Sequence, residues 1–186
     1  MEDWVTQIID ELKKTKQNDQ KTSNFIEQIG ATMIGVKPAC LVSISSKKCL
    51  KLCKTNFTNS SPVAFVVVKC CGEKKQLFIY HKEKLRSVLT NAKNRRCLIE
   101  LGYPKEGNVE TYVRLLVEKL RSEQFPHESG LFFGYPLKDV CGFMGKAIPY
   151  RKTMGWRMYG DTRISENVYY QFKNARSYVR DMLLRA

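Results

Sequence analysis

The sequence contains few of the features that usually mark a reactive site. It has two histidines, His81 and His127, and no two cysteines in CxxC spacing. It also lacks a phosphate-binding GxxxxGK loop, a GxGxxG dinucleotide motif and a GxSxG nucleophile motif. Two histidines leave few options for a catalytic triad, so the residue types favour a protein that is not an enzyme.

Long apolar runs are absent as well. The longest is Val63–Val68, VAFVVV, whereas a membrane-spanning helix needs about 20 apolar residues. The first residues, MEDWVTQIIDELKK, lack the basic-then-apolar order of a secretory signal. The seven cysteines are odd in number and include the adjacent pair Cys70-Cys71, which favours reduced thiols over a disulfide framework. We therefore expect a cytoplasmic protein without a membrane partner.

The composition is that of a folded domain. The chain has 186 residues, of which 43% are hydrophobic and 27% charged, close to the average for globular proteins. No Gly/Ser-rich linker or internal repeat interrupts it, so we expect one domain over residues 1–186. The net charge of +14 is spread along the chain and is densest in 81–96, HKEKLRSVLTNAKNRR, and 146–157, KAIPYRKTMGWR.

Hydrophobic periodicity indicates both helices and strands. It predicts helices over 2–16, around Phe25, over 81–89, before Gly102, over 109–124 with Asn108 as N-cap, and over 168–182. Strands are expected over 39–44 and 155–159, with a hairpin formed by 62–71 and 76–80. The unbroken apolar run at 63–68 suggests a central strand covered on both faces. The order of elements predicts an α+β fold, a single domain with a mostly antiparallel sheet of about four strands packed with helices.

Three stretches resemble a known family. FPHESGLFFGYPLKDVCGFM (125–144), ATMIGVKPACL (31–41) and GWRMYGD (155–161) are similar to the bacterial domain-of-unknown-function family 3793, noted for a Pro-His-Glu motif. The resemblance spans nearly the whole chain and implies no particular activity. A histidine expected before Ala31 and cysteines expected at Thr153-Met154 are missing here, and no metal or cofactor is expected.

The motif Pro126-His127-Glu128 has two interpretations. Proline and an acid suit the first turn of a helix, where Phe125, Leu131, Phe132 and Phe133 would anchor the segment in the core. Alternatively, His127 belongs to a pocket, with Glu128 beside it. Consecutive helical residues diverge by about 100°, so the two side chains need not share a partner. A metalloprotease motif is excluded because Leu131 stands where the second histidine is required.

Our leading hypothesis is a non-catalytic binding or regulatory module. Its candidate ligand-binding residues are His127, Glu128, Lys37 and Trp156. Lys37 is included because it precedes Pro38 in one of the family-like stretches, and a lysine there could hold an anion. The partner itself is unknown, and an anionic ligand is one class that these residues suit.

Two alternatives stay open. The first is nucleic-acid binding through the two basic segments, with phosphates held by Lys93, Arg95, Arg96, Arg151, Lys152 and Arg157. The second is an enzyme, a hydrolase or transferase, that uses His127 and Glu128. Cys49 and Cys53 would share a face if their stretch is helical, but no cysteine spacing calls for metal, so buried inert thiols are expected.

Overall fold

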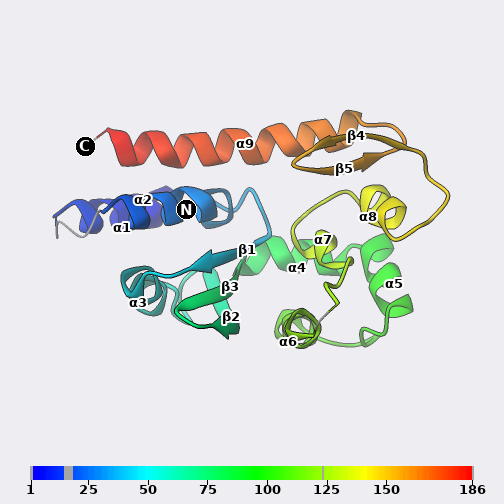
Figure 1. Ribbon diagram of the computed structural model, residues 1–186, viewed down its shortest axis with the longest axis horizontal. Helices are drawn as coiled ribbons and strands as arrows, with labels where there is room; N and C mark the ends of the chain where they lie inside the picture. The colour runs from blue at the N-terminus through cyan, green and yellow to red at the C-terminus, as the bar shows by residue number, and fades with distance from the viewer. Residues whose placement is uncertain (1, 15–18, 123, 186) are drawn as a thin grey trace. The chain divides into compact units, whose positions relative to one another are not determined.

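The protein is described by a computed structural model that covers residues 2–14, 19–122 and 124–185 (Figure 1). The chain groups into two compact units. We call Met1–Lys82 with Phe172–Ala186 the N-terminal unit, and Glu83–Gln171 the middle unit. Helices and antiparallel strands do not alternate regularly, which confirms the α+β fold class. That the whole chain forms one domain stays a prediction.

The N-terminal unit combines helices with a three-stranded sheet. Its elements are α1 (Glu2–Lys14), α2 (Gln20–Met33), β1 (Ala39–Ile44), α3 (Lys47–Asn56), β2 (Val63–Cys71), β3 (Lys74–His81) and the later part of α9 (Arg163–Leu184). The strand order is β1-β3-β2 and both pairings are antiparallel. The predicted strand at 39–44 and the predicted hairpin are thus present.

The predicted position of the apolar strand was wrong. Within this sheet β3 is the central strand and β2, which carries VAFVVV, pairs on one side only. Side chains 64–67 are accordingly only half-buried, whereas Leu77, Phe78 and Ile79 of β3 have no exposed surface. Strand order depends on pairing between distant segments, so the hydrophobicity of one run does not determine which strand is central.

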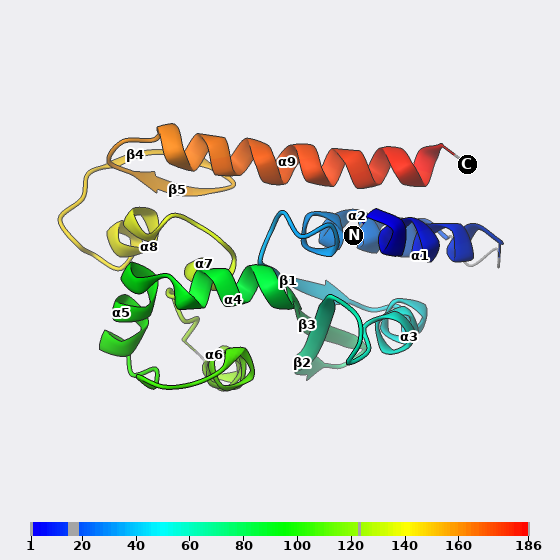
Figure 2. The same ribbon diagram turned by 180° about the vertical axis from the view of Figure 1, so that it is seen from behind.

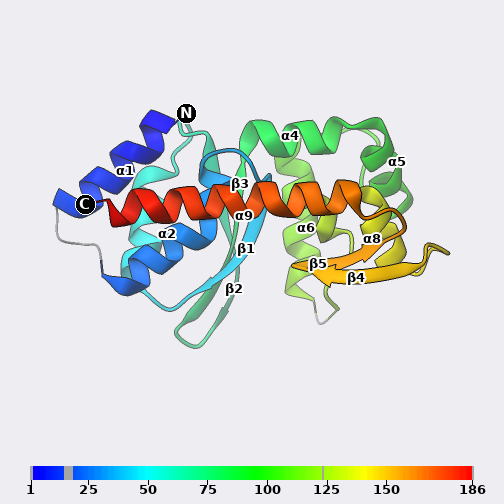
Figure 3. The ribbon, with the colours of Figure 1, turned by 90° about the horizontal axis from the view of Figure 1, so that it is seen from above.

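The helices of this unit build a layered core. Helix α2 packs on β1 and β3, and α3 lies beside the sheet (Figure 2). On its other side, α2 contacts α9 so closely that a Cβ on Gly30 would lie 2.8 Å from Cβ of Val179. In Figure 3 the later part of α9 crosses over α2. The unit is therefore layered, with the sheet on one side, α2 in the middle and α9 outside it. Mostly aliphatic side chains pack between these layers.

The middle unit is mainly helical. It contains α4 (Lys82–Thr90), α5 (Ala92–Glu100), α6 (Val109–Arg121), α7 (Ser129–Phe132), α8 (Leu137–Phe143), β4 (Tyr150–Met154), β5 (Trp156–Tyr159) and the start of α9. Asn108 caps α6 as predicted, since its side chain accepts a hydrogen bond from the Thr111 backbone nitrogen. The strands β4 and β5 pair with each other only, so the described strands divide between two sheets.

The β4-β5 hairpin packs on α8 (Figure 3). Gly142 of α8 permits this contact, because a Cβ there would overlap the ring of Tyr159. Gly155 turns the chain between the two strands with φ of 71°, a conformation that favours glycine. The hairpin thus lies against α8, which is the arrangement on which the candidate site depends.

Other predictions differ at their edges. The first helix ends at Lys14, and residues 15 and 16 of the predicted span lie outside the described residues. The helix predicted over 109–124 ends at Arg121, where Ser122 forms its C-cap. The short elements α8 and β4 were not predicted, because they are too brief to produce a periodic pattern. In the described part of the chain, no helix has the length and apolar character that crossing a membrane requires.

Candidate functional site

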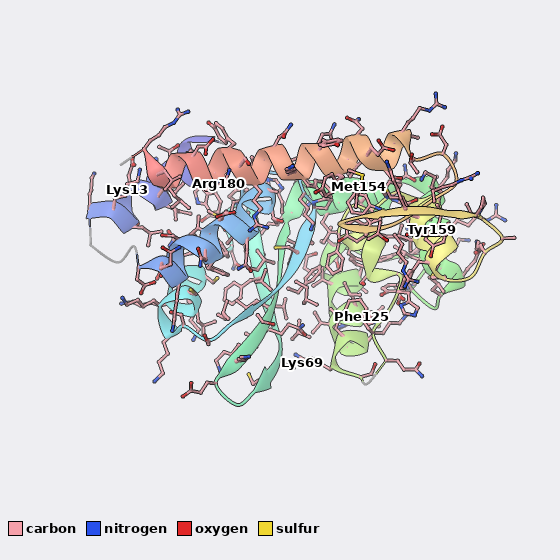
Figure 4. All side chains as sticks on the ribbon, turned by 45° about the horizontal axis from the view of Figure 1, so that its top comes forward. Lys13, Lys69, Phe125, Met154, Tyr159 and Arg180 are labelled. Atoms are coloured by element: carbon pink, nitrogen blue, oxygen red, sulfur yellow. The ribbon has the colours of Figure 1, made fainter. Side chains whose placement is uncertain are left out.

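A cavity of about 600 Å³ lies within the middle unit. Nine of its twelve lining residues fall between Phe125 and Phe143, and the other three, Thr153, Trp156 and Arg157, belong to the hairpin. Two of the three family-like stretches therefore supply nearly all of the cavity wall. In Figure 4, Phe125 marks the segment before α7 and Tyr159 marks the end of β5.

Aromatic side chains form much of the wall. They are Phe125, Phe133, Tyr135, Phe143 and Trp156. The rings of Tyr135 and Trp156 stack, with their centroids 4.4 Å apart and an angle of 15° between their planes. Phe125 and Phe143 are 52% and 44% exposed, so parts of both rings are open to solvent and to the cavity. Ring faces of this kind around a hollow suit a flat, apolar group.

A buried carboxylate fixes the hairpin beside the cavity. Asp139 of α8 is 2% exposed, and its Oδ2 accepts a hydrogen bond of 2.8 Å from Nε1 of Trp156. Its Oδ1 accepts from the backbone nitrogen of Tyr159 at 2.9 Å and from Nζ of Lys138 at 2.7 Å. Asp139 therefore orients the Trp156 indole and ties β5 to α8.

The same carboxylate is held in its charged form. Burial alone would raise the pKa of Asp139, but hydrogen bonds from Lys138, Ser165, Trp156 and the Tyr159 backbone hold it below its ordinary value. Lys138 also donates 2.7 Å hydrogen bonds to the Tyr159 carbonyl and to Oγ of Ser165. Asp139 is poorly suited to act as a base, because its pKa is low and its oxygens already accept hydrogen bonds. Its role is to hold the parts of the site together.

Three exposed residues of the cavity wall can donate hydrogen bonds, and they are His127, Thr153 and Arg157. The His127 ring meets the Phe143 ring edge-on, with centroids 4.9 Å apart and an interplanar angle of 85°. The Arg157 guanidinium carbon lies 5.6 Å from the centroid of the same ring. Two of the sequence-predicted residues, His127 and Trp156, thus line one cavity together with Arg157, which had been assigned to nucleic-acid binding.

Glu128 points elsewhere. It is 6% exposed, and its Oε1 accepts hydrogen bonds from Nζ of Lys119 at 2.8 Å and from the Tyr103 hydroxyl at 3.2 Å. Burial, reinforced by the Glu128 carboxylate, raises the pKa of Tyr103, so that hydroxyl stays protonated and donates. His127 and Glu128 are adjacent, but their side chains point in different directions. His127 lines the cavity, whereas Glu128 binds Lys119 of α6.

The helix-start interpretation also fits the local backbone. Nitrogens of Ser129 and Leu131 donate to the carbonyls of Pro126 and Glu128, which forms the turn that opens α7. Leu131, like Phe132, has no exposed surface, so it anchors the turn as expected. The prediction that Phe125 is a further core anchor was wrong, because Phe125 is half exposed and lines the cavity, whose wall it helps to complete.

Lys37 belongs to the N-terminal unit and does not line this cavity. It is half-buried, its Nζ lies 5.4 Å from the centroid of the Phe172 ring, and burial lowers its pKa. The aromatic contact accounts for its position within that unit. A role for Lys37 or Glu128 in ligand binding stays a prediction.

The six residues proposed for nucleic-acid binding are divided among α5, β4 and β5. They are Lys93, Arg95 and Arg96 on α5, Arg151 and Lys152 on β4, and Arg157 on β5. Arg96 pairs with Glu100 at 3.4 Å, Lys152 pairs with Glu166 at 2.9 Å, and Arg95 donates to the Lys105 carbonyl. Because half of the set already has internal partners, the nucleic-acid alternative gains no support from the geometry and stays a prediction.

The cysteines are mostly buried. Stretch 47–56 is helical, and both Cys49 and Cys53 are buried on α3. Burial raises the pKa of the Cys53 thiol, which disfavours the thiolate that metals and electrophiles require. Among the side chains that the structure describes, no three from His, Cys, Asp or Glu gather in a group that could hold a metal ion.

The structure thus defines an α+β protein with an aromatic-lined cavity beside a hairpin. Its sequence from residue 25 to 186 matches the family model described as protein of unknown function (DUF3793), and the chain belongs to this family. The suspected family resemblance is thereby confirmed. No curated protein and no solved structure matches the chain.

Sequence reasoning missed most of the cavity wall. Its aromatic members apart from Trp156, together with Asp139, were not assigned to a site. One signal was available, since stretch 125–144 is rich in aromatics and contains the paired charges Lys138-Asp139. The same composition is also typical of a stretch buried in the hydrophobic core, however. The cavity depends on a contact between α8 and β5, and these two elements are separated in the sequence.

Proposed function

We propose that this protein is a non-catalytic, cytoplasmic binding module whose cavity takes a small molecule with a flat apolar part. The observation that carries the proposal is the 600 Å³ cavity with five aromatic residues in its wall. Ligand sites in proteins are commonly hollows of about 300–1,000 Å³ with apolar walls and a few polar groups. The cytoplasmic setting rests on the odd cysteine count and the adjacent Cys70-Cys71 pair.

The polar groups of the wall support binding over catalysis. Asp139 has its oxygens occupied by Lys138, Trp156 and Tyr159. Glu128, the natural partner for His127 in acid–base chemistry, is directed to Lys119 instead. His127 is therefore left as a donor at the cavity without a carboxylate from its own motif to activate it.

The first test is calorimetric titration with 2-naphthamide, a flat neutral probe. Binding is expected, and Phe143→Ala should weaken it roughly tenfold, because an aromatic contact contributes on the order of 1 kcal/mol beyond its area. Tyr178→Ala is the matched control, since Tyr178 is 43% exposed against 44% for Phe143 but lies on the N-terminal unit's part of α9. No binding, or equal losses in both variants, would refute the cavity as the site.

His127→Ala provides a second variant at the same site. Because His127 is exposed, truncation should leave the melting temperature nearly unchanged while weakening binding of the probe. Circular dichroism melts of the variant and the parent protein measure this directly. If His127→Ala instead unfolds the protein, the histidine serves the turn before α7 and not the cavity.

A further inference from the structure

The charges around the cavity are unbalanced. Asp139 is the acid of the wall, and Lys138 beside it, 2.7 Å from Oδ1, neutralises its charge. Arg157 is exposed and, among the residues that the structure describes, forms no ion pair with an acid. The wall therefore presents one net positive charge, with the His127 ring as a second donor.

Arg157 is positioned by aromatic contacts. Trp156, the preceding residue on β5, has its indole nitrogen held by Asp139 and its ring stacked on Tyr135. Because Arg157 directly follows Trp156 on β5, the fixed position of Trp156 also fixes the backbone from which the Arg157 side chain extends. The Arg157 guanidinium then lies over the Phe143 ring, which restricts it without using its hydrogen-bond donors.

The same ring brings His127 to this side of the cavity. Phe143 contacts His127 through an edge-on packing at 4.9 Å and Arg157 at 5.6 Å. One exposed aromatic residue is therefore flanked by two hydrogen-bond donors. A ligand that rests its ring against Phe143 would present its substituent to this pair.

Resting on the proposed function, we infer that the cavity selects flat aromatic carboxylates. The ring of such a ligand would occupy the aromatic part of the cavity. Its carboxylate would accept paired hydrogen bonds from Arg157, whose planar guanidinium matches a carboxylate in shape and charge. His127 would add a further donor on the Phe143 side. The buried Asp139 does not oppose this, because its charge is already paired with Lys138.

The test compares three probes of one shape in calorimetric titrations of the full chain at pH 7. They are 2-naphthoate, the neutral 2-naphthamide and the cation 2-naphthylmethylammonium. The carboxylate should bind about tenfold more tightly than the amide, since hydrogen bonds to charged groups contribute on the order of 1.5–3 kcal/mol. The ammonium compound should bind most weakly of the three.

Arg157→Gln should lower the affinity for naphthoate to about that for naphthamide and so remove the preference, because the paired hydrogen bonds are lost while the ring contacts remain. Arg151→Gln is the matched control, since it removes the same charge from an exposed position on β4 that does not line the cavity. It should keep the preference. Thermal melts of both variants establish that each is folded at the titration temperature.

The outcomes separate the two claims. If the amide and the carboxylate bind equally, the inference is overturned and the proposed binding function holds. If the preference survives Arg157→Gln, or is lost equally in Arg151→Gln, recognition by Arg157 is overturned as well. If none of the three probes binds, the proposed function fails and the inference with it.

Discussion

The N-terminal unit and the middle unit bury different kinds of side chain. The N-terminal core is mostly aliphatic with three cysteines, and α2 and α9 approach closely where Gly30 meets Val179. The middle unit buries two carboxylates, Glu128 and Asp139, and has a cavity lined by aromatics. The N-terminal unit is packed mostly from apolar groups, whereas the middle unit buries two carboxylates and has a cavity beside one of them, Asp139.

This difference has a physical reason. A buried ion pair rarely stabilises a fold more than apolar packing would, because both charges lose their hydration. The pairs Lys119–Glu128 and Lys138–Asp139 add directional hydrogen bonds, which fix the orientation of the groups that they join. In the middle unit Glu128 lies directly before α7, and Asp139 ties the β4-β5 hairpin to α8, so each pair orients a short element.

The largest effect is expected in the aliphatic core. Ile29→Ala should lower the free energy of unfolding by about 3 kcal/mol, because Ile29 has no exposed surface and the lost methyl groups leave a void. Ile29→Val should cost about 1 kcal/mol. Urea denaturation measures both. At urea concentrations below the unfolding transition, both variants should bind 2-naphthamide as tightly as the parent does. A change in affinity would mean that the core of the N-terminal unit affects binding in the middle unit.

Asp139→Asn should reduce stability less than Ile29→Ala does, but it should reduce binding more. Asp139→Asn leaves Lys138 without its ion-pair partner and should cost about 2 kcal/mol, less than a fully buried pair because Lys138 is 25% exposed. The variant should also weaken probe binding, since Trp156 loses its charged acceptor. Glu83→Gln, which breaks the exposed Arg86 pair in the same unit, is the control and should change neither quantity measurably.

The smallest effect is a pH dependence of the contribution that Asp139 makes to stability. Asp139 has a lowered pKa in the folded protein, so its stabilisation is fully present above the ordinary value of 3.8. It is lost as the pH falls through the lower, folded-state pKa. The difference in unfolding free energy between the parent and Asp139→Asn should therefore shrink below pH 4. The difference in unfolding free energy between the parent and Ile29→Ala should not shrink in this pH range. If it shrinks in parallel, the pH dependence does not come from Asp139.

The sequence predicted elements that have strong local signals. The strand at Ala39–Ile44 and the helix that Asn108 caps follow from β-branched content, periodicity and a capping side chain. The order β1-β3-β2 could not be predicted, because a register between distant strands leaves no mark on either one alone. The residues of a segment therefore predict whether it forms a helix or a strand. Which strands lie next to each other depends on pairing between segments that are far apart in the sequence.

The site divides in the same way. His127 and Trp156 could be nominated because histidine and tryptophan are rare and carry recognisable chemistry. Asp139 could not, because its role depends on Trp156 and Tyr159, about twenty residues away in the sequence. Arg157 was assigned to a different function, since a charge count cannot tell a solvated arginine from one resting on an aromatic ring.

Helix α9 has a consequence for the order in which the chain becomes structured during synthesis. Val179 and Leu183, near its end, complete the core that begins with Val5 and Ile8. The middle unit lies between these segments in the sequence, so it leaves the ribosome whole while the N-terminal unit still lacks part of its interior. The core of the N-terminal unit is therefore complete only after the C-terminal part of α9 has been translated.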